Sequence, residues 1–163
     1  MEKAKRAKDT VTEQAYVIMH RHINGCGRLF GGQLMQWIDE AAGIISKRYS
    51  QAETITAAVD NLDFKEGAYL NDIIVLTGKV TYVGNSSVEV RVDTYVEDLD
   101  GTRKIINRAY AVMVAVDGAG HPVRVPRLVT ETREEQEEWE QGQKRYELRN
   151  STARRSISPL ESV

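Results

Sequence analysis

The stretch QLMQWIDEAAGIISKRY, residues 33–49, is rich in apolar residues and contains no proline. Its apolar positions cover most of a helical circumference, a pattern typical of a helix that is buried on most sides. These positions are Leu34, Met35, Trp37, Ile38, Ala41, Ala42, Ile44 and Ile45. The stretch therefore predicts a central helix surrounded by the rest of the chain.

Strand-like segments lie on both sides of this helix. One precedes it and four follow it, all rich in β-branched or aromatic residues and separated by turn signals. They are residues 11–19, 54–64, 72–83, 86–97 and 103–116. In residues 86–97 valines alternate with charged residues, which predicts one buried and one polar face. With too few helices for parallel crossovers, we expect an α+β fold in which an antiparallel five-stranded sheet wraps around the central helix.

The two ends of the chain differ from this domain, which we place at residues 11–129. Residues 1–10 hold four cations and almost no apolar side chains, so we expect a flexible basic arm. Residues 130–149 carry acids early and basic residues late, which favours a surface helix that docks through Trp139, Tyr146 and Leu148. Residues 150–163 are expected to form a disordered tail.

The composition argues against several classes of function. The 163 residues include 22 basic and 24 acidic side chains, and a net charge of −2 gives no general attraction to nucleic acid or to an anionic membrane. The single cysteine, Cys26, cannot form an intramolecular disulfide, and no apolar stretch of signal-peptide length follows the N-terminus. We expect a cytoplasmic protein that binds neither nucleic acid nor membrane.

Asp39 is the unusual residue of the predicted helix, because it lies between Ile38 and Ala41 in its most apolar part. A carboxylate buried there alone would cost several kcal/mol or would take up a proton. Alternatively, Asp39 and the adjacent Glu40 form a narrow polar stripe that faces solvent or a partner subunit. The periodicity is compatible with both interpretations.

The loop before the helix, NGCGRLFGG at residues 24–32, is rich in glycine. Its closing residues, Gly31 and Gly32, place unshielded backbone N–H groups at a helix N-terminus, where an anion or a polarised carbonyl oxygen is stabilised. The same glycines are also compatible with a tight turn or close packing. No lysine followed by serine or threonine completes a phosphate-binding loop.

A family resemblance is carried by residues 24–43, NGCGRLFGGQLMQWIDEAAG. They are similar to the signature of the acyl-CoA hydrolases of the hot-dog superfamily, both bacterial enzymes and the long-chain cytosolic type of animals. The similarity continues through residues 56–64, 83–87 and 125–132 and extends over residues 11–149. It implies the hot-dog fold and the hydrolysis of fatty acyl-CoA to free fatty acid and coenzyme A.

The resemblance also implies roles for single residues. In this family an asparagine at the position of Asn24 and an aspartate at that of Asp39 form the active site and come from different hot-dog units. Because this chain has one such unit, the resemblance implies a homodimer with two composite sites, and three dimers can form a hexamer. Coenzyme A is then part of substrate and product, and no separate cofactor or metal is expected.

Our mechanistic hypothesis makes Asp39 a general base or a nucleophile. Asn24 orients the nucleophile, while backbone N–H groups near Gly31 and Gly32 polarise the thioester carbonyl.

The turn Gly84-Asn85-Ser86-Ser87 resembles the family segment that lies along the pantetheine and pyrophosphate of coenzyme A. Asn85 and Ser86 are equally compatible with a plain hairpin turn. A basic residue should meet the nucleotide phosphates, and the candidates are Arg91, Arg103, Lys104 and Arg127.

Other reactive side chains offer no competing chemistry. His20 and His22 have no clustered cysteine or further histidine to complete a metal site, and Cys26 has no evident base partner. Two alternative functions remain within the fold, an acyl-thioester hydratase or dehydratase and a non-catalytic acyl-CoA sensor. The predicted helix carries an aspartate and no histidine, and no helix-turn-helix pattern is present, so hydrolysis is favoured.

Overall fold

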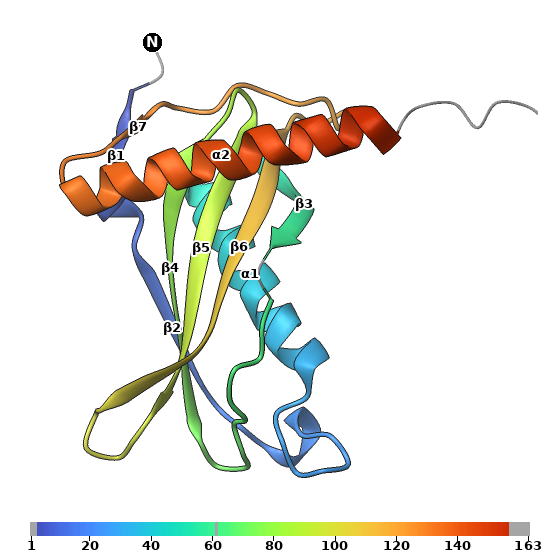
Figure 1. Cartoon of the computed structure of the whole chain (residues 1–163), viewed down its shortest axis with the longest axis vertical. Coiled ribbons are helices and arrows are strands. Elements are labelled where there is room, and N and C mark those ends of the chain that lie inside the picture. Colours follow the sequence, from blue (N-terminus) through green and yellow to red (C-terminus); the bar gives the residue numbers. More distant parts are fainter. Residues whose placement is uncertain (1–2, 61, 157–163) are drawn as a thin grey trace, which may run out of the picture.

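The structure is a computed structural model that describes residues 3–60 and 62–156, with side chains to residue 152. Its main sheet has five antiparallel strands in the order β2-β4-β5-β6-β3. They are β2 (Thr12–Val17), β3 (Glu53–Asp60), β4 (Ile73–Val83), β5 (Ser87–Glu97) and β6 (Arg103–Val116). Helix α1 (Gly31–Ser50) lies along one face of this sheet (Figure 1). The expected α+β architecture is confirmed, although β3 ends at Asp60, short of the predicted residue 64.

Helix α1 supplies the centre of the hydrophobic core. Leu34, Ile38, Ala42 and Ile45 are each at most 2% exposed and pack with the inward valines of the sheet. The expectation that the helix is buried on most sides is wrong for this chain, because Met35 is 48% exposed. The sheet covers only one side of α1, so the opposite side remains at the surface.

Helix α2 (Arg133–Ser156) crosses the other face of the sheet, in front of β4, β5 and β6 in Figure 1. Trp139 and Tyr146 pack against Tyr82, with ring centroids 5.2 and 5.6 Å apart, as predicted. Leu148 is 68% exposed, so its predicted contact is wrong; two positions after Tyr146 it points away from the docked face. The helix also continues beyond the predicted residue 149 to Ser156. The remainder of the predicted tail, 157–163, lies outside the described residues.

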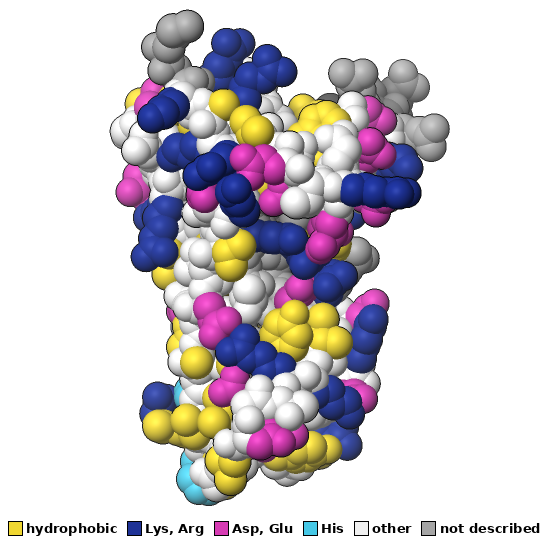
Figure 2. Space-filling view, turned by 90° about the vertical axis from the view of Figure 1, so that its left-hand side faces the viewer, with side chains coloured by type: hydrophobic (Ala, Val, Ile, Leu, Met, Phe, Trp, Pro, Cys, Tyr) yellow, Lys and Arg dark blue, Asp and Glu magenta, His cyan; other side chains and the backbone are white. Residues whose placement is uncertain are grey.

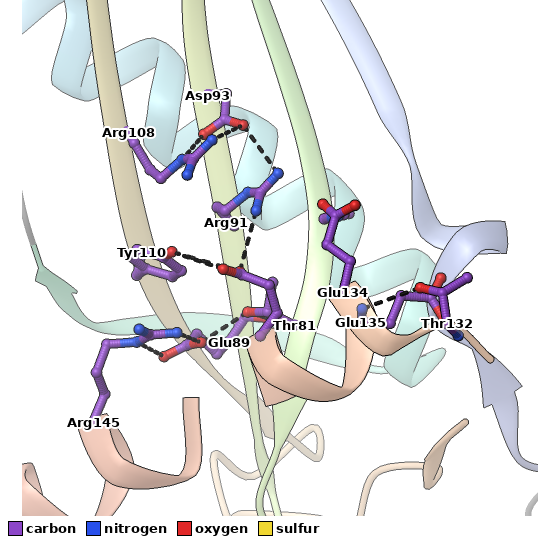
Figure 3. Close-up of polar contacts among 12 residues, drawn as sticks. Thr81, Glu89, Arg91, Asp93, Arg108, Tyr110, Thr132, Glu134, Glu135 and Arg145 are labelled. Carbon is purple, nitrogen blue, oxygen red and sulfur yellow. Dashed lines mark hydrogen bonds and ion pairs between the residues drawn. The ribbon is translucent and has the colours of Figure 1, made fainter. Parts of the chain in front are cut away.

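The polar face of β5 is covered by α2 and holds buried charges (Figure 3). Glu89 is 1% exposed, and Arg145 of α2 donates two hydrogen bonds of 2.9 and 2.8 Å to its carboxylate. Thr81 donates a third bond of 2.8 Å. Alternation along a strand identifies its two faces but not what covers them. A neighbouring ionic group joins Arg91, Asp93, Arg108 and Glu138.

Residues 5–10 are packed against the domain, which corrects the expectation of a flexible arm. β1 (Lys5–Arg6) pairs in parallel with β7 (Leu128–Val129), and a short 3₁₀ helix, Ala7–Thr10, follows. The Lys5 ammonium donates to the carbonyl oxygens of Arg48 and Tyr49 at the C-terminus of α1, where a cation is favoured by the helix dipole. Lys5 therefore caps the C-terminus of α1 and does not belong to a flexible arm.

The surface agrees with the balanced charge of the sequence. On the face shown in Figure 2, basic and acidic side chains are interspersed, and hydrophobic groups form separate patches. No helix of the described residues is long and apolar enough to cross a membrane.

The Arg145–Glu89 pair yields a stability prediction. Arg145→Met leaves a buried carboxylate without its partner, so we expect the free energy of unfolding to fall by about 3–5 kcal/mol in urea titrations. Arg133→Met, on a side chain that is 92% exposed, is the matched control. The double variant Glu89→Met with Arg145→Met should lose less than the single variant, and an equal or larger loss would contradict this account.

Candidate active site

Asp39 lies on the exposed side of α1, so the polar-stripe interpretation is confirmed and the buried one is wrong. Thr56 of β3 donates a 2.5 Å hydrogen bond to Asp39 Oδ1. This bond fixes the orientation of the carboxylate and leaves Oδ2 able to accept a proton. One turn away, Gln36 donates to Glu40 at 2.8 Å along the same stripe.

Thr56 is a site residue for which sequence analysis proposed no role. The ladder between β3 and β6 pairs Thr56 with Met113 and Ala58 with Val112, so Ala57 is an extra residue in a β-bulge. Bulges of this kind redirect side chains beside functional sites. The only sequence signal was the position of Thr56 at the start of a segment that resembles the family.

Asn24 closes the glycine-rich loop on itself. Its Oδ1 accepts hydrogen bonds from the backbone N–H groups of Cys26 and Arg28, at 2.9 and 3.2 Å. Its own N–H donates to the Arg28 carbonyl at 2.8 Å. The side-chain Nδ2 is then the atom of this amide that can donate to a substrate or to water.

Asn24 and Gly31 line the same pocket, which has a volume of about 280 Å³ and apolar walls that include Leu34 and Phe64. Gly31 lies close to one of these walls, since a Cβ atom would lie 3.3 Å from the Phe64 ring. At Gly32 a Cβ atom would lie 2.5 Å from the Phe30 ring. Phe30 precedes the helix and offers no side-chain cap, so the N–H groups of Gly31 and Gly32 are suited to an external acceptor.

The structure does not bring Asp39 into this pocket. Gly31 and Asp39 are eight positions apart on one straight helix, which separates them by about 12 Å along its axis. One chain therefore presents two half-sites. The first is formed by Asn24, Gly31 and Gly32, and the second by Asp39 with Thr56.

The predicted coenzyme A turn lies near the second half-site. Asn85, Ser86 and Ser87 line a pocket of about 310 Å³ together with Ala57 and Ala58, the residues that follow Thr56. The turn is also an ordinary hairpin connection, in which the Gly84 N–H donates to the Ser87 carbonyl at 2.9 Å. Gly84 lines an adjoining pocket instead, and a Cβ atom there would lie 2.6 Å from Ser87 Oγ.

Three of the four basic candidates for the nucleotide phosphates are engaged in ion pairs. Arg91 contacts Asp93 and Glu138, and its side chain is 13% exposed. Arg103 contacts Glu13 and Glu97, and Lys104 contacts Glu66. Arg127 lines the pocket that also contains Gly84. The turn instead has two other arginines beside it, Arg124 and Arg149.

The histidines of the loop differ in their surroundings. His22, in the short 3₁₀ helix His20–His22, is buried edge-on to Trp37 and accepts a 3.0 Å hydrogen bond from the Met19 N–H. His20 and Cys26 are exposed. Within residues 3–60 and 62–156, no group of three or more His, Cys, Asp or Glu side chains is placed to hold a metal ion.

The chain is similar to proteins of a known family. The model of the thioesterase superfamily matches residues 26–101. The chain is 42% identical over 113 residues to an acyl-CoA thioester hydrolase of Bacillus subtilis, covering 69% of this chain and 66% of that protein. A solved hexameric acyl-CoA thioesterase has a TM-score of 0.84 and 31% identity, with 93% of this chain and 97% of that chain covered.

A solved acyl-CoA hydrolase from Staphylococcus aureus, in complex with butyryl coenzyme A and coenzyme A, has a TM-score of 0.87. It is 28% identical, and the match covers 94% of each chain. These matches define a hot-dog protein. The chain belongs to the thioesterase superfamily, within its group of acyl-CoA hydrolases. It spans about two thirds of the Bacillus subtilis relative (66%) and 32% of the mammalian cytosolic acyl-CoA hydrolases that it matches.

His22 makes stability depend on pH. Burial, and secondarily the charge of Arg21, lower the pKa of His22 below its ordinary value. Below about pH 6.5 the unfolded state therefore binds more protons than the folded state, and stability falls as the pH falls from there toward the folded pKa. His22→Gln should flatten this slope in urea titrations between pH 7.5 and 5. The exposed control, His20→Gln, should retain it, and an equal effect of both variants would contradict the assignment.

Proposed function

We propose that this protein is an acyl-CoA thioesterase that hydrolyses fatty acyl-CoA to free fatty acid and coenzyme A. The observation that carries the proposal is the hydrogen bond from Thr56 to Asp39, which presents an oriented carboxylate on the exposed side of the core helix α1. The acyl-CoA complex of the Staphylococcus aureus relative supports the substrate class.

Spacing along the chain supports the same residues. Solved variants of the Staphylococcus aureus hydrolase replace an asparagine, an aspartate and a threonine by alanine, and these positions are separated by fifteen and then seventeen residues. Asn24, Asp39 and Thr56 have the same two separations. We infer that these three residues belong to one active site.

The site is completed by a second copy of the chain. The half-site of Asn24 and Gly31 lies too far along α1 to serve Asp39 of the same chain. β3 ends the strand order and carries the exposed apolar residues Ile55 and Val59, 56% and 37% exposed, on either side of Thr56 in the sequence. An uncovered strand edge with apolar side chains suits a subunit interface. We therefore propose a homodimer, and the hexameric state of the solved acyl-CoA thioesterase supports a further assembly of three such dimers.

In the proposed reaction, the N–H groups of Gly31 and Gly32 stabilise the oxyanion that forms on the thioester carbonyl. In the general-base version Asp39 Oδ2 takes a proton from water, which attacks the carbonyl carbon, and the C–S bond breaks to release the coenzyme A thiolate. In the nucleophilic version Asp39 attacks, the thiolate leaves, and water hydrolyses the resulting anhydride. A single turnover in ¹⁸O-labelled water tests for the anhydride, because attack of water on its aspartyl carbonyl gives an unlabelled fatty acid and labels Asp39, whereas the general-base version always labels the fatty acid.

The composite site is tested by mixing two inactive variants. Asn24→Ala and Asp39→Ala should each release thiol from acyl-CoA at least about a hundredfold more slowly than the wild type. After subunit exchange of an equimolar mixture, half of the dimers are hybrids with one intact site of two, so activity should return to about a quarter of the wild-type value.

No recovery in exchanged dimers would place both residues in the same chain and contradict the shared site. Absence of hydrolysis by the wild type, despite binding of coenzyme A, would instead support the hydratase or the sensor.

Thr56 is predicted to position the base. Thr56→Val removes a hydrogen bond to a charged group, so we expect kcat to fall about ten- to a hundredfold with little change in KM. Thr56→Ser should restore most of the activity. Thr54→Val is the matched control, because the Thr54 hydroxyl contacts Ser46 instead of Asp39. Unchanged kcat in Thr56→Val would show that the hydrogen bond has no role in catalysis.

A further inference from the structure

The pocket beside the turn 85–87 has a wall that comes from α2. Tyr146, Arg149 and Asn150 face the small residues of β3 and of the turn across a volume of about 310 Å³. The thioesterase superfamily model matches residues 26–101, so this wall lies outside the matched region. The pocket therefore combines a segment shared with the superfamily and one supplied by the C-terminal helix.

Arg149 is the cation of this wall, and its position is fixed. Its Nη1 donates a 2.6 Å hydrogen bond to Asp60 Oδ2, while the side chain remains 23% exposed. A guanidinium has five N–H donors in a planar fork, and this contact uses one of them. Within the described residues no other partner of this guanidinium is found, so its remaining donors can reach a second anion, and holding the group in place lowers the entropy lost on binding.

A second arginine contacts the turn from another segment of the chain. Arg124 Nε donates to Asn85 Oδ1 at 3.2 Å, and the Val125 N–H donates to the Asn85 carbonyl at 3.0 Å. Asn85 lines the pocket. Two arginines thus lie beside the turn, one on α2 and one on the segment before β7.

We propose that Arg149, with Arg124 as a second contact, binds the phosphate groups of the coenzyme A nucleotide. This inference rests on the proposed function. The thioester has to lie at the half-site of Thr56, and β3 leads from there through Ala57 and Ala58 to Asp60. Because Ala57 is the extra residue of the bulge, Asp60 lies about 10 Å further along the strand. The phosphates are the anionic groups of coenzyme A and are separated from the thioester by the pantetheine arm. Arginine binds phosphate with parallel charge-assisted hydrogen bonds.

The competing explanation is that Arg149 only fastens α2 to β3 through Asp60. The two explanations differ in their substrate dependence, since a phosphate contact matters only for a substrate that has phosphates. We therefore compare an acyl-CoA with the corresponding acyl-pantetheine, which has the same thioester but no nucleotide and no phosphate.

The experiment measures kcat and KM of Arg149→Ala on both substrates. We expect KM for acyl-CoA to rise about ten- to a hundredfold with kcat nearly unchanged, and the kinetics on acyl-pantetheine to match the wild type. Arg149→Lys keeps the charge, so its KM for acyl-CoA should lie between that of the wild type and that of Arg149→Ala. Arg133→Ala on the exposed face of α2 is the control, and thermal unfolding verifies that each variant is folded.

The variant Asp60→Ala distinguishes the attachment of α2 to β3 from the binding of phosphate by Arg149. It breaks the same ion pair but leaves the guanidinium, so it should raise KM for acyl-CoA less than Arg149→Ala does. Equal losses on both substrates, equal effects of the Asp60 and Arg149 variants, or an unchanged KM for acyl-CoA would each overturn the proposal without affecting the activity of the wild type.

If the wild type hydrolyses neither substrate, the proposed function fails while the phosphate contact is still tested by calorimetry. Weaker binding of coenzyme A, but not of pantetheine, by Arg149→Ala would retain the contact. Equal binding of coenzyme A by the two proteins would overturn it.

Discussion

Helix α1 must satisfy two opposing demands with one period of 3.6 residues. Its inner side has to be almost wholly apolar, since Ile38 and Ala42 lie in the middle of the core at 1% and 0% exposure. Its outer side has to present a carboxylate, and Asp39 lies immediately after Ile38 in the sequence. A step of about 100° per residue separates the two environments without a break in the helix. The curved sheet is therefore arranged around one side of α1 and leaves the other open.

On the opposite face of the sheet, charged side chains are buried and need partners. A long strand such as β5 presents a charged face, and α2 covers it with its own charges, so the buried Glu89 is neutralised by Arg145 and hydrogen-bonded by Thr81. Gly142 permits the approach, because a Cβ atom there would lie 2.5 Å from Tyr82 and 2.8 Å from Glu89. Helix docking thus depends on a missing side chain as much as on the aromatic contacts.

Sequence patterns predicted what is local in this protein. The helix at 33–49 and the hairpins follow from periodicity and turn residues. The roles of Asn24, Gly31 and Asp39 come from glycine placement and family resemblance and stay predictions. The patterns failed where a distant segment decides the outcome. Lys5 was predicted to belong to a flexible arm, because the carbonyl oxygens that accept its hydrogen bonds are those of residues 48 and 49, and no local pattern connects them to Lys5. The contact of Thr56 with Asp39 was not predicted, because the bulge beside Thr56 depends on the pairing of β3 with β6 and leaves no signal in the sequence of β3.

The same distinction explains how function is divided along the chain. The region matched by the superfamily model contains α1, β3 and the turn 84–87, which hold Asp39, Thr56 and the predicted coenzyme A segment. α2 lies beyond it and contacts this region through aromatic rings on Tyr82 and through several ion pairs. Two of these ion pairs are those of Arg145 with Glu89 and of Arg149 with Asp60. The first contact is deeply buried and stabilises the fold, whereas the second is partly exposed at the edge of a pocket. A helix anchored firmly at one point can hold a binding residue at the other without itself depending on that residue for its position.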